Sequence, residues 1–182
     1  MRIIAGKLRS RTIVAPPGSS TRPTGDKARG ALFNILHGII GNARVLDGFA
    51  GSGALSFEAL SRGAAEAVLF EIDRAAAKML EDNARSLGVL SQAEIHQADF
   101  FNGIQRLKGR VFDLVFLDPP YASGLLTKAI EICAGLLAPG GMVVAEHSSD
   151  DTLPDNVAGL IKTGTRTYGA AAFSFYKRQE DR

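Results

Sequence analysis

The chain has 182 residues, of which 46% are apolar and 22% charged, a length and composition that predict one globular domain over residues 1–182. The single cysteine, Cys133, excludes an internal disulfide, and the sequence contains neither a signal peptide pattern nor an apolar run of the roughly 20 residues that a membrane span requires. These features argue against a disulfide-stabilised secreted domain and a membrane protein, and they predict a cytoplasmic location.

Positive charge is concentrated in the first quarter of the chain. Residues 1–44 contain eight Lys or Arg and one acid, Asp26, whereas acidic residues are in excess over the rest of the sequence. Such an asymmetry is typical of a segment that neutralises nucleic-acid phosphates. Charge alone leaves open a terminus that is merely solvated.

Residues 1–25 mix β-forming with basic residues and include a Pro-, Gly- and Ser-rich stretch at 16–20. This pattern predicts a basic β-hairpin or extended arm that is followed by a loop. A helix is expected over 26–39, because the apolar residues of this stretch recur at helical spacing and form one stripe.

From residue 43 onward, short apolar runs alternate with helical stretches, the pattern of a mostly parallel sheet covered by helices on both faces. The runs are continuous, as expected for strands buried on both sides. Residues 157–165 and 170–177 predict a closing hairpin, so the sequence predicts a doubly wound α/β domain. Strands are expected at 45–46, 67–70, 93–96, 112–117 and 142–145, and helices at 52–62, 74–87, 100–108 and 124–137.

A glycine-rich turn at residues 48–53 directly follows the first expected strand and precedes a helix. Ligands of open α/β sheets bind outside the carboxyl ends of the strands, so this turn predicts a nucleotide-like cofactor. The sequence Gly51-Ser52-Gly53 lacks the third glycine of a dinucleotide fingerprint, and Asp47 would repel a pyrophosphate. The pattern therefore favours S-adenosylmethionine, which carries no phosphate.

Two acids are placed to bind the rest of such a cofactor. Glu71, at the end of the second expected strand, could accept both ribose hydroxyls. Asp99, after the third, could accept from the adenine amino group, with Phe100 beside the ring; Asp73 is interpreted as a helix cap. The candidate cofactor-binding residues are Asp47, Phe49, Ala50, Gly51, Gly53, Glu71, Asp99 and Phe100.

The tetrapeptide Asp118-Pro119-Pro120-Tyr121 follows a buried strand on the same edge of the sheet and is the candidate catalytic motif. An aromatic amine is a poor nucleophile, so its site must accept hydrogen bonds from the N–H groups as positive charge develops. Asp118 and the Pro119 carbonyl could accept them, Pro120 stiffens the turn, and Tyr121 offers a face for stacking a flipped-out base. The motif predicts methylation of a base amino group.

Other chemistries fit the sequence less well. Methylation of cytosine C5 needs a cysteine nucleophile, but Cys133 lies on an expected helix face and is interpreted as core packing. The three histidines, His37, His96 and His147, lack metal-ligand spacing, so no metal site is expected.

Over essentially its whole length the sequence resembles the RsmD-type bacterial 16S rRNA guanine-N2 methyltransferases. The resemblance is carried by residues 1–6, 22–24, 32–36, 49–53, 58–64 and 117–121. It implies a class I S-adenosylmethionine-dependent methyltransferase fold, which is Rossmann-like, with a seven-stranded mostly parallel sheet and an antiparallel C-terminal hairpin. It also implies that the N2 amine of guanine 966 in 16S rRNA is methylated.

The resemblance further implies a substrate and an RNA surface. The substrate would be 16S rRNA within the 30S subunit or its assembly intermediate, with ribosomal proteins as further contacts, and the enzyme would be a monomer. The basic segment 1–25 would serve as an RNA-binding arm, and Thr24 would lie near the base. The residues assigned to rRNA phosphates on this ground are Arg9, Arg11, Arg22, Lys27 and Arg29.

The sequence departs from the family's usual pattern in three places: Gly30 replaces a glutamate, Gly48 a leucine, and Ser56-Phe57 a glycine and an aliphatic residue. If the glutamate helps to bind the cofactor or base, another group must do so here. Alternative functions that the residues leave open are an adenine-N6 DNA methyltransferase, a nicotinamide-dependent oxidoreductase, and a noncatalytic RNA-binding module.

Overall fold

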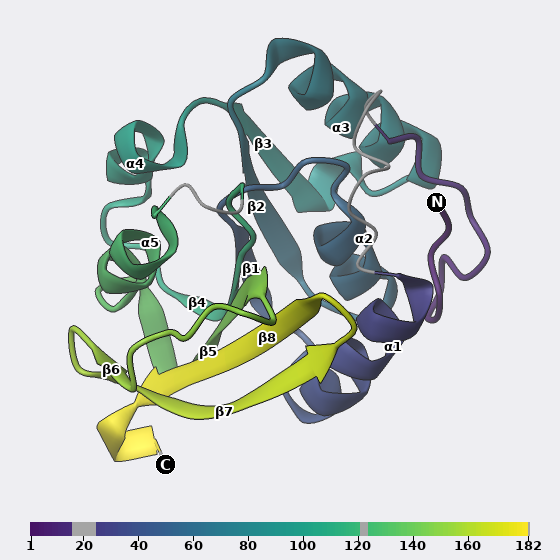
Figure 1. The fold of residues 1–182 in the computed structure, drawn as a ribbon. Helices are drawn as coiled ribbons and strands as arrows, with labels where there is room; N and C mark the ends of the chain where they lie inside the picture. Colours follow the sequence, from purple (N-terminus) through teal and green to yellow (C-terminus); the bar gives the residue numbers. More distant parts are fainter. Residues whose placement is uncertain (16–24, 121–123, 182) are drawn as a thin grey trace.

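The computed structural model describes residues 1–15, 25–120 and 124–181. Its centre is one sheet of eight strands in the order β3-β2-β1-β4-β5-β8-β7-β6 (Figure 1). The strands are β1 (Arg44–Asp47), β2 (Glu66–Glu71), β3 (Ala93–Gln97), β4 (Phe112–Leu117), β5 (Leu137–Ser148), β6 (Asn156–Val157), β7 (Leu160–Tyr168) and β8 (Ala171–Arg178). The α/β methyltransferase fold expected from the resemblance is confirmed.

The first five strands form the parallel half of the sheet, with β1 between β2 and β4. The chain order reverses direction at β1, because β2 and β3 lie on one side of it and β4 and β5 on the other. In such sheets the carboxyl ends of the two central strands flank a crevice that binds ligands. The fold therefore places the turn after β1 beside the turn after β4.

The remaining strands close the sheet in antiparallel fashion: β8 pairs with both β5 and β7, and β6 pairs with β7. The expected hairpin is present, with its strands at Leu160–Tyr168 and Ala171–Arg178. The eighth strand, β6, has two residues, too few to produce a recognisable hydrophobic pattern.

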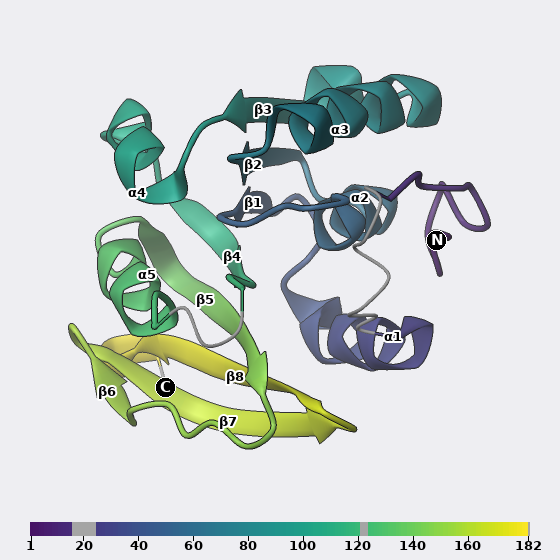
Figure 2. The same ribbon diagram turned by 45° about the horizontal axis from the view of Figure 1, so that its top comes forward.

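Helices cover both faces of the sheet (Figure 2). One core contains residues of α1, α2 and α3 together with Val45, Leu69 and Phe116, and the other contains residues of α4 and α5 with Leu46 and Phe70. Neighbouring strand residues thus point to opposite layers, as the pleat requires. The helices are α1 (Asp26–Ile35), α2 (Ala54–Ser61), α3 (Arg74–Leu87), α4 (Phe100–Gly103) and α5 (Leu126–Cys133), with 3₁₀ turns at Leu36–Gly38, Leu90–Gln92, Ile104–Leu107 and Gln179–Asp181.

Local signals explain where helix boundaries agree with expectation and where they differ. Helix α3 has the expected bounds, because the Asp73 side chain accepts from Ala76 N at 2.8 Å and Gly88 ends the helix in a left-handed conformation. Helix α5 ends earlier than expected, since β5 already begins at Leu137. A register shift between Phe112 and Leu114 accommodates the Pro-Gly-Gly turn within β5.

Residues 1–13 form a small hairpin that packs on α2, with an isolated antiparallel bridge between Arg2 and Thr12. The buried Glu58 carboxylate of α2 accepts from Ile4 N at 2.8 Å and Ala5 N at 3.1 Å. Within the hairpin, the side chains of Ile3 and Ile13 are almost fully buried. Among the helices in the described ranges, none has the length and apolar character needed to cross a membrane.

Replacing Gly30 by alanine is expected to stabilise the protein. A Cβ at this position in α1 would meet only Ile4, at 3.9 Å, which is ordinary contact. Alanine should therefore raise the free energy of unfolding by about 1 kcal/mol, because it lowers the backbone entropy of the unfolded chain. Urea denaturation measures this change.

Gly53→Ala is the matched control, because Gly53 has φ of +76° and an added Cβ would overlap the Phe57 ring. It should destabilise the protein. A destabilising Gly30→Ala would contradict the expected gain.

Candidate active site

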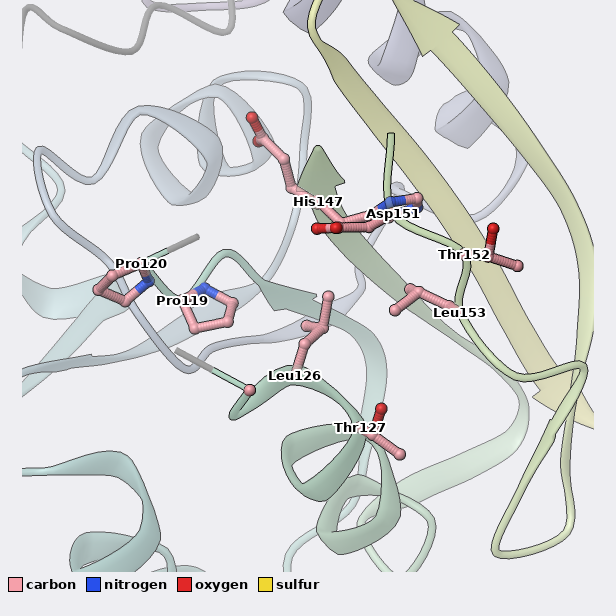
Figure 3. A pocket seen from close by; sticks show the side chains of 10 residues that line it. Pro119, Pro120, Leu126, Thr127, His147, Asp151, Thr152 and Leu153 are labelled. Carbon is pink, nitrogen blue, oxygen red and sulfur yellow. The ribbon is translucent and has the colours of Figure 1, made fainter. Parts of the chain in front are cut away.

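Two cavities open at the carboxyl ends of the parallel strands, with volumes of about 580 Å³ and 330 Å³. They share Pro120 and Glu146 as lining residues, so they adjoin at the turn after β4. The larger is lined by the glycine loop and by residues that follow β2, β3 and β4. Figure 3 shows the smaller, which lies between Pro119 and Pro120 on one side and His147, Asp151 and Leu153 on the other.

The glycine loop is held to its neighbouring strands by backbone hydrogen bonds. Gly48 N donates to Phe116 O at 3.0 Å, and Ala50 N donates to Phe70 O at 2.9 Å. Gly53 has a left-handed φ of +76° at the start of α2 and lies beneath the loop. Phe49, Ala50 and Gly51 line the larger cavity, whereas Gly53 shapes the turn without lining it.

Glu71 and Asp99 both line the larger cavity, and each also holds the backbone locally. The Glu71 carboxylate accepts from Gly51 N and from Asp73 N, both at 2.9 Å. Asp99 caps α4 by accepting from Asn102 N at 3.0 Å. Their positions therefore depend on backbone contacts that exist without a ligand. Their roles toward ribose and adenine stay predictions.

Phe100 forms part of an aromatic cluster at one wall of the larger cavity. Its ring centroid lies 5.4 Å from that of Phe49 and 5.7 Å from that of Phe70. A Cβ at Gly48 would lie 3.0 Å from Leu117 and 3.2 Å from Phe100. Glycine at this position thus leaves room for the Phe100 ring to pack closely.

Asp47 ends β1 as a buried carboxylate that lines the larger cavity. Burial raises its pKa to about 6, against the opposing effect of a hydrogen bond from Ser56 Oγ at 2.8 Å. The nearby Glu71 carboxylate raises the pKa further. The hydrogen bond from Ser56 therefore partly offsets the desolvation of the Asp47 carboxylate.

The structure places the candidate catalytic turn between the two cavities. Asp118 lines the larger one, Pro119 the smaller one, and Pro120 both. Asp118 is half-buried at the end of β4, and Pro119 is buried. Tyr121 lies outside the described residues.

Glu146 is a residue of this site that the sequence analysis did not single out. It is 3% exposed near the end of β5 and lines both cavities. The sequence could have indicated Glu146, because it is an acid near the carboxyl end of the fifth strand. Glu71 was selected as a candidate because it has the same position at the end of the second strand. Met1, Leu55 and Ile72 also line the larger cavity without having been predicted.

Arg29 was expected at the RNA surface, and its position does not fit that assignment. Its side chain is 2% exposed and lines the larger cavity. Burial in α1 leaves it unable to contact an external phosphate, so the expectation is corrected. Arg9, Arg11 and Lys27 are exposed, and Arg11 donates to Ser86 O at 2.6 Å. Arg22 and Thr24 lie outside the described residues.

Cys133 is fully buried on α5, and burial raises the pKa of its thiol far above the usual value. A thiol in that environment is not a nucleophile, which agrees with its interpretation as core packing.

His96 stacks on Phe70 with ring centroids 4.9 Å apart, and His147 Nε2 lies 2.8 Å from Ser174 Oγ. In the described ranges, no group of three His, Cys, Asp or Glu side chains is arranged to hold a metal ion.

Comparison with known proteins places the chain in a family. Residues 1–177 match the family described as Conserved hypothetical protein 95. The chain is 36% identical to Ribosomal RNA small subunit methyltransferase D of Escherichia coli over 181 residues, which cover 98% of the chain and 90% of that protein.

Solved structures share the fold. The yhhF protein of Escherichia coli has a TM-score of 0.87 at 37% identity, with 98% of this chain and 97% of that chain covered. An RNA methyltransferase from Salinibacter ruber in complex with S-adenosyl-L-homocysteine has a TM-score of 0.65 at 21% identity, covering 87% and 95% respectively. At that identity the second likeness shows the fold alone.

The raised pKa of Asp47 predicts a pH-dependent stability difference between the wild type and Asp47→Asn. Between about pH 4 and pH 6 the folded protein keeps a proton that the unfolded chain has released, so wild-type stability falls as pH rises through this window. The asparagine side chain of the variant does not titrate. The stability of the variant relative to wild type should therefore rise by about 2 kcal/mol between pH 4 and pH 7.

Chemical denaturation at several pH values measures this difference, and the titrations shared by both proteins cancel. A difference that stays constant across the window would show that Asp47 ionises normally in the folded protein.

Proposed function

Because the chain belongs to the RsmD-type family described as Conserved hypothetical protein 95, we propose that it transfers a methyl group from S-adenosylmethionine to the N2 amine of guanine 966 in 16S rRNA. Methylation of ribosomal RNA, the broader part of this activity, rests on similarity over nearly the whole chain to proteins named Ribosomal RNA small subunit methyltransferase D. The sequence identity is 36% to both the Escherichia coli and the Haemophilus influenzae protein. The chain is accordingly a methyltransferase of ribosomal RNA.

The observation that carries the proposal is the meeting of two cavities at residues 118–120. A methyl transfer requires a donor and an acceptor in line, with the reacting atoms close together. The larger cavity suits the donor, because the glycine loop and the acids after β2 and β3 line it. The smaller cavity then holds the acceptor base on the other side of Pro120.

The side chains of the larger cavity fit S-adenosylmethionine. Five carboxylates suit the hydroxyl, amino and cationic groups of this cofactor, and they would oppose a pyrophosphate. The cofactor supplies a methyl group activated by its positively charged sulfur. We assign Glu71 to the ribose, Asp99 to the adenine amino group and Phe100 to the side of the adenine ring. The lining carboxylates are Asp47, Glu71, Asp99, Asp118 and Glu146.

Asp118 and Pro119 are assigned to the acceptor amine. The lone pair of an exocyclic amine is delocalised into the ring, and positive charge grows on nitrogen as the new bond forms. The Asp118 carboxylate and the Pro119 carbonyl accept the two N–H hydrogen bonds and stabilise that charge. Consecutive prolines fix the direction of this carbonyl. Tyr121 is proposed as the stacking partner of the base.

Glu146 supports guanine as the acceptor. Guanine presents adjacent N1–H and N2–H donors on its Watson–Crick edge, whereas adenine presents an acceptor at N1 beside its amine. A buried carboxylate at the junction of the cavities accepts from guanine N1–H, while the N2–H groups face Asp118 and Pro119, and it opposes the adenine N1 lone pair. Leu126 and Leu153 give the smaller cavity apolar walls against which a flipped-out base can pack.

The basic N-terminal hairpin is assigned to the rRNA backbone. Arg9 and Arg11 of the hairpin and Lys27 of α1 are exposed, and we retain Arg22 and Thr24 as proposed contacts. The substrate proposed is 16S rRNA within the 30S subunit or an assembly intermediate, with ribosomal proteins contributing to the surface that is recognised. The enzyme is proposed to act as a cytoplasmic monomer.

Asp118→Ala tests the chemistry. Loss of the carboxylate should lower kcat for methyl transfer to 30S subunits about 100-fold or more, because the charge that develops on the amine loses a preorganised acceptor. Transfer of radiolabelled methyl groups measures the rate, and filter binding measures subunit affinity, which should change little.

Asp113→Ala is the matched control, since Asp113 begins the same strand and pairs with Arg44 at the opposite edge of the sheet. Its kcat should stay near that of the wild type. Equal losses in the two variants would indicate damage to β4 rather than a role in catalysis.

Arg9→Gln tests the RNA surface. If Arg9 contacts a phosphate, removing its charge should weaken subunit binding and make the dependence of log affinity on log salt shallower by about 1. Lys108→Gln, an exposed charge just before β4 and away from the hairpin, should leave the slope unchanged. An unaltered slope for Arg9→Gln would remove this residue from the interface.

A further inference from the structure

Arg29 is a buried cation, and a role in hydrophobic packing does not account for a charged side chain at this position. It lies in α1, its side chain is 2% exposed, and it lines the larger cavity. Its Nε has almost no accessible surface and makes no hydrogen bond. A buried donor without a partner costs about 1–3 kcal/mol, and because Nε is covered, a ligand in the cavity can meet only the rest of the guanidinium.

The guanidinium is held in place from its other end. Nη2 donates to Arg2 O at 2.6 Å and to Asp26 Oδ1 at 3.0 Å. The Glu58 carboxylate lies 4.0 Å from Nε, beyond hydrogen-bond reach, and it already accepts from Ile4 N, Ala5 N and Arg62 Nε. Arg29 is therefore preorganised beside the cavity that it lines.

A cofactor with a carboxylate needs a positively charged group in the larger cavity, because most of the charged side chains that line this cavity are acidic. Its lining includes five carboxylates, and Arg29 is the only basic side chain among the described lining residues. The carboxylates suit every polar group of the proposed cofactor except its own carboxylate, which they would repel. A guanidinium is the group best matched to a carboxylate in a partly desolvated site.

Arg29 also lies at the appropriate end of the cavity. Phe33, one helical turn later on the same face of α1, packs on Phe116 of β4 with ring centroids 5.9 Å apart. This contact places Arg29 toward β4 and its catalytic turn. Glu71 and Asp99, assigned to the ribose and adenine, follow β2 and β3 on the other side of β1.

We propose that the Arg29 guanidinium donates a hydrogen bond to the carboxylate of the methionine moiety of S-adenosylmethionine. The proposal rests on the proposed function, because it presumes that this cofactor occupies the larger cavity. It also gives Arg29 a role consistent with its burial, in place of a contact to rRNA. The shared bond to Arg2 O links the cofactor's amino acid end to the N-terminal hairpin.

Calorimetric titration with two ligands that differ only in this carboxylate tests the proposal. The ligands are S-adenosylhomocysteine and its decarboxylated form, S-adenosyl-3-thiopropylamine. Wild type should bind the first at least about 10-fold more tightly. Arg29→Met should weaken S-adenosylhomocysteine about 10- to 100-fold and leave the decarboxylated ligand within about threefold.

Two further variants distinguish binding from folding. Lys108→Met removes the same charge from an exposed position before β4 and should change neither affinity. Arg29→Met with Glu58→Gln removes both buried charges, and it should show the same ligand-specific loss if Arg29→Met alone unfolds. Circular dichroism and thermal melting report the fold.

Equal weakening of both ligands, or none, in the Arg29 variants would overturn the proposal while leaving the cofactor assignment intact. Equal affinities of the wild type for the two ligands would overturn it without any variant. If the wild type bound neither ligand, the cofactor assignment itself would fail, and the role of Arg29 would fail with it.

Discussion

The backbone hydrogen bonds that join β1 to β2 and β4 determine where the side chains of the site lie. They extend past the end of β1, where Gly48 and Ala50 donate to carbonyls of the two neighbouring strands. Because all three strands are parallel, Asp47, Glu71 and Asp118 reach the same edge of the sheet. The acids therefore lie close together, and desolvation raises the pKa of Asp47, the most deeply buried of them. This crowding of carboxylates determines which ligand the cavity can hold.

A second constraint comes from the buried Glu58 carboxylate. It accepts backbone N–H groups of the N-terminal hairpin, pairs with Arg62 at 2.7 Å and lies near Arg29. One carboxylate in α2 thus fixes the hairpin assigned to rRNA, and that hairpin in turn accepts a hydrogen bond from the arginine assigned to the cofactor. A buried charge cluster of this kind is costly unless its members are paired, so the hairpin and α1 depend on each other for their positions.

Much of the fold could be predicted because local and long-range signals agree. Helix α3 is capped at both ends, and β4 ends in the continuous buried apolar run 114–117. The rule for strand ends located Glu71 and Asp99, whose side chains line the larger cavity. The position of Arg29 could not be predicted in this way, because charge patterns do not show burial and its surroundings include Glu58, a residue distant in sequence. The start of β5 at Leu137 could not be predicted, because the strand includes a Pro-Gly-Gly turn that normally ends a strand. A register shift against β4 accommodates this turn.

Mass-spectrometric mapping of the methylated nucleotide tests most directly whether the two cavities hold S-adenosylmethionine and a guanine. The purified protein would be incubated with labelled cofactor and 30S subunits from a strain without the corresponding methyltransferase, and the 16S rRNA would be digested and analysed. A single N2-methylguanosine is the result expected from the proposed Asp118, Pro119 and Glu146 acceptors, and the family resemblance implies position 966 for it. Methylated adenine, or no label in RNA from intact subunits, would contradict it.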